Sequence, residues 1–139
     1  MSIIKFHQDL KVYQESFKTA MEIFELTKIF PKEELYSLAD QIRRSSRSVS
    51  VNISEAWGKR KYEKSFVAKL TDSEGEARET QSWLDFALAC KYINEEQYNN
   101  LNKQYNHIIG MFGDYDESIR KVVLIRREIS RRVLEWKSY

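Results

Sequence analysis

The residues best suited to chemistry lie between positions 41 and 61, in the stretch QIRRSSRSVSVNISEAWGKRK. If this stretch is helical, one set of polar residues recurs at steps of three and four and therefore shares one side of the helix. The members of this polar stripe are Gln41, Arg44, Ser48, Asn52 and Glu55. Small hydrogen-bonding side chains one turn apart predict a polar seam packed against another helix, and they do not form a catalytic constellation.

A second polar stripe, with three carboxylates, is expected on the helix predicted for residues 62–92. It comprises Asp72, Glu76, Glu79 and Trp83. If the two helices are antiparallel about a turn near residue 60, Arg44 lies near Glu76 and Gln41 near Glu79. A covered guanidinium without a partner would cost several kcal/mol, so we expect Arg44 to meet one of these acids. The acids could also gather a hard cation, but ion pairing with the arginines is the favoured interpretation.

Basic residues form three groups that could meet nucleic acid. Arg43 and Arg47 lie one turn apart on the predicted outer face of the 41–57 helix. Lys59, Arg60 and Lys61 crowd the following turn, and Arg126 and Arg127 belong to a basic C-terminal segment. Contacts from such groups would go mostly to the phosphate backbone or to RNA shape, not to particular bases.

The alternatives for these basic groups are structural. Arg43 and Arg47 could pair with Asp40 or with a neighbouring subunit, and the 59–61 turn could simply be solvated. Residues 119–139 hold seven Lys/Arg against two Glu, a charge of +5. Because the whole chain carries +2, the other 118 residues carry −3. The segment is thus either a handle for an acidic partner or a solvated amphipathic helix.

No residue pattern favours an enzyme. A di-iron bundle needs paired Glu-x-x-His motifs, but the residues three before His7 and His107 are Ile4 and Gln104. We expect Cys90 to be a buried structural thiol, since it follows Phe86, Ala87 and Leu88. The sequence therefore predicts no catalytic residue, no metal and no cofactor.

Four helices are expected to position these groups. The first covers residues 10–28, with Asp9 as its N-cap, and the second runs from Pro31 to Trp57 before Gly58. The third covers 62–92, and Asn94 with Gln97 predicts a capping box that opens the fourth. Gly110 and Gly113 mark either a close helix contact or a break before the C-terminal segment.

Apolar stripes give each predicted helix a core face. The first helix should bury Leu10, Tyr13, Phe17, Ala20, Met21 and Phe24; the second Leu38, Ile42, Val49, Ile53 and Ala56. The third should bury Phe66, Leu70, Ser73, Ala77, Thr80, Leu84 and Leu88; the fourth Tyr98, Leu101, Tyr105, Ile108 and Phe112. A further stripe, Val122, Ile125, Ile129, Val133 and Trp136, makes the C-terminal segment amphipathic.

These helices predict an all-α fold, an antiparallel up-down-up-down four-helix bundle. We expect one bundle domain over residues 1–118 and a basic C-terminal helical extension over 119–139. The chain has 139 residues, a single cysteine, and no apolar run long enough for a signal peptide or a membrane span. The expected compartment is therefore the cytoplasm. Trp57, Trp83 and Trp136 are expected to be exposed and to anchor subunits or a partner.

Several motifs, in their order and spacing, are similar to one protein family. They are DLKVYQ (9–14), Phe30-Pro31, QIRRSSRSVSVNISEA (41–56), FVAKL (66–70) and EARETQSWLDFA (76–87). Over about residues 8–118 the chain resembles the 23S rRNA intervening-sequence proteins, also called the four-helix bundle protein family. The family's usual Asn-Ile-Ala-Glu-Gly is Asn-Ile-Ser-Glu-Ala here, from Asn52, with glycine delayed to Gly58.

The resemblance implies a bacterial cytoplasmic bundle that assembles into a ring-shaped homopentamer. A related branch of the family serves diversity-generating retroelements, where a basic pentamer binds nucleic acid and a reverse transcriptase. The predicted function is thus a non-enzymatic homo-oligomer that binds RNA or DNA through basic patches. The alternative is a protein-interaction scaffold that binds no nucleic acid.

Overall fold

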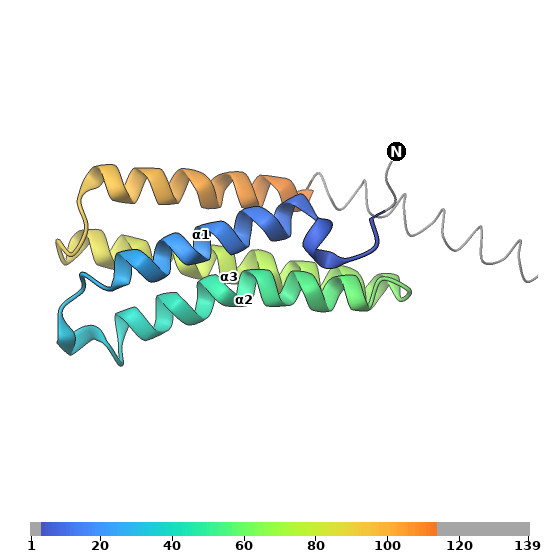
Figure 1. Cartoon of the computed structure of the whole chain (residues 1–139), viewed down its shortest axis with the longest axis horizontal. Helices are drawn as coiled ribbons and strands as arrows, with labels where there is room; N and C mark the ends of the chain where they lie inside the picture. The colour runs from blue at the N-terminus through green and yellow to red at the C-terminus, as the bar shows by residue number, and fades with distance from the viewer. Residues whose placement is uncertain (1–3, 114–139) are drawn as a thin grey trace, which may run out of the picture.

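The computed structural model describes residues 4–113, and within them the chain forms four α-helices and no strand. The helices are α1 (Lys11–Thr27), α2 (Leu38–Gly58), α3 (Glu63–Ala89) and a fourth helix over residues 95–113. Successive helices run in opposite directions (Figure 1), and α2 packs against both α1 and α3. The predicted antiparallel four-helix bundle is confirmed. No helix in the described part is long and apolar enough to cross a membrane.

The start of the fourth helix agrees with the sequence, whereas the starts of α1 and α2 differ. Asn94 and Gln97 form the predicted capping box: each side chain accepts the backbone N–H of the other, at 2.9 and 2.8 Å. Asp9 does not cap α1. It accepts the N–H of Phe6 at 3.2 Å and lies in a short 3₁₀ helix, η1 (His7–Asp9), that precedes α1.

The second helix does not begin at Pro31. Pro31 stays extended, with ψ 146°, and is followed by the 3₁₀ helix η2 (Lys32–Glu34). Ser37 then breaks the helical path with φ −127° and ψ −106°, so α2 begins only at Leu38. The proline therefore initiates a separate short turn, and the predicted stop at Gly58 holds.

The C-terminal end of α3 is closed by a left-handed residue that is not glycine. Lys91 has φ 64°. Its N–H donates to Leu88 O and the N–H of Tyr92 donates to Ala87 O, each at 2.9 Å. These two bonds form a Schellman motif, which satisfies carbonyl groups that the helix end would otherwise leave open.

The core face of α2 is as predicted, whereas the predicted face of the first helix is confirmed only at Leu10 and Ala20, which are buried. Leu38, Ile42, Val49, Ile53 and Ala56 are all buried. On α1, however, Phe17 is 52% exposed and Met21 is 47% exposed. The buried residues of α1 are Val12, Ser16, Thr19, Ala20, Ile23 and Thr27. The helix is therefore rotated away from the expected face, with aromatic and methionine side chains outside.

Buried hydroxyl groups explain this rotation. Ser16 Oγ lies 2.9 Å from Ser50 Oγ of α2, and both residues are buried. Thr19 Oγ1 donates to Gln104 of the fourth helix at 3.0 Å. These bonds satisfy polar groups that burial would otherwise penalise by about 1–3 kcal/mol each. A helix face with small hydroxyl residues can therefore pack inward here.

The same chemistry joins α2 to α3. Ser45 Oγ and Thr80 Oγ1 are 2.8 Å apart, and both residues are fully buried. Ser73 Oγ donates to the backbone oxygen of Val49 at 2.6 Å. The described helices are thus held by an apolar core that contains paired hydroxyls. Gly110 and Gly113 have open space where a Cβ would lie, so within residues 4–113 neither marks a close helix contact.

Candidate functional site

The predicted meeting of the two polar stripes occurs at the surface. Arg44 Nη2 lies 3.8 Å from Glu79 Oε1 and donates to Gln41 Oε1 at 3.0 Å. The partner is Glu79, one turn beyond the Glu76 expected from the sequence. Because the Arg44 side chain is 60% exposed, the pair is solvated and contributes at most about 1 kcal/mol. The Arg44 guanidinium is therefore exposed, whereas the polar-seam hypothesis required it to be covered.

The C-terminal residues of the polar stripe on α2 make two kinds of contact, one within α2 and one with α3. Ser48 and Asn52 are half-buried, and Asn52 Nδ2 donates to the backbone oxygen of Ser48, within the same helix. Glu55 reaches α3, where its Oε2 lies 2.8 Å from Lys69 Nζ. That hydrogen bond lowers the pKa of Glu55 and raises the pKa of Lys69. The stripe thus contacts α3 through charged pairs at its two ends.

Glu76 is a partly buried carboxyl group of α3 whose pKa is raised. Its Oε2 is buried and has no hydrogen-bond partner in the described part of the chain. Burial raises the pKa of Glu76, the hydrogen bond that its protonated form donates to Glu79 raises it further, and Arg44 opposes the shift. Burial and the neighbouring Glu79 carboxylate therefore both favour the protonated form of Glu76. Across residues 4–113 no group of three or more His, Cys, Asp or Glu is arranged to hold a metal ion.

Arg43 and Arg47 gather around an aromatic ring of α1. The Arg43 guanidinium carbon lies 5.1 Å from the centre of the Phe24 ring, and the Arg47 carbon lies 5.7 Å from it. Lys28 Nζ is 4.8 Å from the same centre. Arg43 Nε also donates to Thr27 Oγ1 at 2.7 Å. We call Lys28, Arg43 and Arg47 with Phe24 the Phe24 cluster.

The cations of the Phe24 cluster differ in their charge partners. Lys28 pairs with Glu25 at 3.1 Å. Within residues 4–113, no carboxylate lies within 4.0 Å of Arg43 or Arg47, so the alternative pairing with Asp40 is not formed. The sequence did not reveal this cluster, because the apolar pattern assigned Phe24 to the core. The arginines at steps of four were its only visible signal.

The other basic residues lie elsewhere. Lys59, Arg60 and Lys61 form the turn between α2 and α3, roughly 18 Å along α2 from Arg47 at 1.5 Å per residue. Arg60 lies over the Trp57 ring at 4.4 Å and donates to the Trp57 backbone oxygen at 2.7 Å. The predicted basic residues thus form two separate groups. Arg126 and Arg127 lie outside the described residues.

Three further expectations are changed by burial. Cys90 is exposed and is not a buried thiol, because it caps α3 at the solvent-facing turn. Trp57 is buried, and its Nε1 donates to the Lys5 backbone oxygen at 3.2 Å, so it is not an exposed anchor. Trp83 is half-buried and lies 5.8 Å from the exposed Phe86 ring. Trp136 lies outside the described residues.

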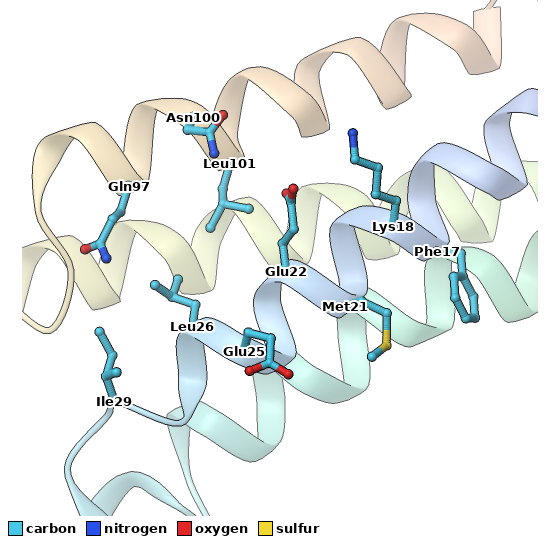
Figure 2. A pocket seen from close by; sticks show the side chains of 10 residues that line it. All are labelled: Phe17, Lys18, Met21, Glu22, Glu25, Leu26, Ile29, Gln97, Asn100 and Leu101. Atoms are coloured by element: carbon cyan, nitrogen blue, oxygen red, sulfur yellow. The ribbon is translucent and has the colours of Figure 1, made fainter.

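An apolar groove follows the outer side of α1. It is open, has a volume of about 880 Å³, and lies between α1 and the fourth helix. Figure 2 shows Phe17 and Met21 along α1, and Leu26 and Leu101 on the two sides of the gap. Ile29, at the end of the groove, is 62% exposed. No sequence pattern identified this surface, because Phe17 and Met21, which line it, were assigned to the core.

Comparison with known proteins identifies relatives of this fold. Residues 8–114 match the sequence profile of the 23S rRNA-intervening sequence protein family. A crystal structure of a protein of unknown function from the S23 ribosomal protein family of Bacteroides thetaiotaomicron is 30% identical, with a TM-score of 0.69. The similarity covers 76% of this chain and 95% of that one. No curated protein matches the sequence.

Proposed function

This chain belongs to the 23S rRNA-intervening sequence protein family, and from that premise we propose that it is a non-enzymatic, self-associating bundle that binds RNA or DNA. Arg43 and Arg47 of the Phe24 cluster would make the contacts, to the phosphate backbone. The observation that carries the proposal is the lack of any carboxylate within 4.0 Å of either arginine in residues 4–113. Their remaining N–H groups are available to an anion.

Positioning by Phe24 and Thr27 supports this assignment. A guanidinium held over an aromatic ring loses less side-chain freedom when it binds a phosphate than a free one does. Arg43 has this restraint twice, from the ring and from Thr27, and Arg47 is the more exposed of the two. A homopentamer, the assembly that the family resemblance implies, would repeat the pair five times and add affinity through multivalency. We also propose that the protein acts in a bacterial cytoplasm and that a reverse transcriptase is one of its partners.

Binding to short single-stranded RNA and DNA oligonucleotides, measured by fluorescence anisotropy over a salt series, tests the proposal. We expect affinity to fall steeply with salt. Arg47→Glu should weaken binding and reduce the salt slope by about one, as expected for a lost phosphate contact. Arg78→Glu is the matched control: it changes the charge equally, on α3, where Arg78 pairs with Glu74 at 3.3 Å. Equal effects of the two variants, or no binding at low salt, would contradict the assignment.

The second candidate is a scaffold that binds protein partners only. It is favoured by exposed aromatic and aliphatic side chains where α2 begins and α3 ends: Tyr36 is 91% exposed, Phe86 57% and Leu35 45%. The buried indole N–H of Trp83 has no acceptor within the described residues, and a partner could supply one. Gel filtration with light scattering, together with the nucleic-acid absorbance ratio at low and high salt, separates the two. An oligomer free of nucleic acid at low salt favours the scaffold.

A further inference from the structure

The groove between α1 and the fourth helix presents an apolar ladder to solvent. Phe17, Met21 and Ile29 are each about half exposed or more, at 52, 47 and 62%. Phe17 and Met21 lie one turn apart on α1, and Ile29 lies eight residues further on, just past the end of the helix; Leu26 and Leu101 line the gap beside them. A contiguous exposed apolar surface of this kind usually marks a contact site. Lys18, Glu22 and Glu25 border it; Glu25 pairs with Lys28 at 3.1 Å, and Glu22 accepts a hydrogen bond from Gln104 at 2.7 Å.

The chain itself carries a segment with matching chemistry. Beyond the described residues, Val122, Ile125, Ile129, Val133 and Trp136 recur at helical spacing, so a helix there would have its own uncovered apolar stripe. As a helix, residues 119–139 would be roughly 31 Å long, enough to cover the roughly 18 Å from Phe17 to Ile29. The segment carries seven Lys/Arg against two Glu.

The point where the described chain ends places this segment within reach. The fourth helix runs opposite to α1 and ends beside the start of α1 (Figure 1). The next five residues are Asp-Tyr-Asp-Glu-Ser, rich in residues that favour turns and helix N-caps. A connection of this length commonly joins antiparallel helices. A short tether also gives an effective concentration in the millimolar range, which favours the groove of the same chain over that of another copy.

We propose that residues 119–139 fold back as a fifth helix into the groove between α1 and the fourth helix of the same chain, against Phe17, Met21 and Ile29. A helix that reverses after the 114–118 connection runs parallel to α1. Counting back along the bundle at 1.5 Å per residue places Ile125 beside Phe17, Ile129 beside Met21 and Trp136 beside Ile29. The two apolar stripes then share nearly the same spacing.

Disulfide trapping in the full chain tests this placement. In a Cys90→Ser background, which removes the only native thiol, Met21→Cys and Ile129→Cys are combined and oxidised at low protein concentration. We expect an intramolecular disulfide, seen as a faster-migrating monomer without reductant. The control pairs Ile129→Cys with Val51→Cys, an exposed position of α2, and should remain reduced. Cross-linked dimers, or equal intramolecular trapping of both pairs, would overturn the proposal.

A labelling measurement gives an independent readout. Met21→Cys, in the Cys90→Ser background, should react with a maleimide at least about tenfold faster once Ile129→Asp and Val133→Asp disrupt docking. Val51→Cys should label at one rate with and without these changes. Far-UV circular dichroism confirms that each variant is folded. An unchanged labelling rate at Met21→Cys, together with no intramolecular disulfide, would refute the fold-back. Neither readout depends on nucleic-acid binding or on the number of subunits.

Discussion

The buried hydroxyl pair of Ser45 and Thr80 makes a stability prediction that depends on both partners. The two oxygens are 2.8 Å apart, and both residues are fully buried. Thr80 Oγ1 also donates to the Glu76 backbone oxygen at 2.9 Å, so its proton has a partner within α3. Ser45 then donates to Thr80, since its other acceptor, Ile42 O, is distant at 3.3 Å. The shared bond therefore depends mainly on the serine proton.

The expected change in the free energy of unfolding depends on which hydroxyl group remains in the core after each substitution. Thr80→Val leaves the buried Ser45 hydroxyl with only its long bond to Ile42, and Ser45→Ala removes the bond and a small volume. A buried polar group deprived of its partner costs about 1–3 kcal/mol, whereas removal of both partners can be nearly neutral. We therefore expect each single variant to lose about 1–2 kcal/mol. The double variant should lose about 1 kcal/mol less than the sum of the two.

Urea unfolding followed by circular dichroism measures these free energies. Protein concentration is held constant, because self-association would add stability by mass action. Ser54→Ala is the matched control: the Ser54 hydroxyl donates only to Val51 O of its own helix, at 2.7 Å. It should change stability by less than about 0.5 kcal/mol. If the two single losses simply add within about 0.3 kcal/mol, the inferred coupling across the α2–α3 contact is wrong.

Three further predictions concern helix ends and the acid pair. Lys91→Gly should raise the free energy of unfolding by about 1 kcal/mol, because glycine adopts φ 64° without strain; Lys91→Ala, which keeps the strain, should give no such gain in thermal unfolding. Asn94→Ala should cost about 1 kcal/mol in urea unfolding through loss of the acceptor for the Gln97 N–H. The folded-state pKa of Glu76 lies above its ordinary value of 4.5. Proton binding to Glu76 therefore stabilises the folded state. This stabilisation is fully present below pH 4.5 and is lost as the pH rises through the folded-state pKa. In Glu76→Gln the free energy of unfolding, measured by urea titration, should fall less between pH 4.5 and the folded-state pKa of Glu76. An unchanged pH dependence would contradict the raised pKa.

The sequence was sufficient for the fold because the number of helices, the start of the fourth helix and the α2 core depend on local patterns. Large aliphatic residues such as Ile42 and Ile53 have one favourable environment, so their spacing predicts the buried face reliably. The capping box at Asn94 and Gln97 is equally local, since both partners lie within three residues. These features need no knowledge of the neighbouring helices.

The orientation of α1 could not be predicted in the same way. Serine and threonine are compatible with the core only when another helix supplies a hydrogen-bond partner, and that partner is distant in sequence, as Ser50 is for Ser16. Once the hydroxyl face of α1 is buried, Phe17 and Met21 must lie outside. The Phe24 cluster was missed for the same reason, because it combines residues from two helices.

The rotation of α1, which places Phe17 and Met21 at the surface, also bears on function. A helix that buries Ser16, Thr19 and Thr27 while it leaves Phe17 and Met21 about half exposed forgoes roughly half of the ~1.5–3 kcal/mol that full burial of each large side chain would contribute. Such an arrangement is stable in water only if the paired hydroxyls and the remaining core compensate for that loss. It becomes favourable once a second surface covers the exposed ladder. The hydroxyl pairs that orient α1 and the groove that α1 presents are therefore linked, and disrupting the Ser16–Ser50 pair should weaken whatever docks in the groove.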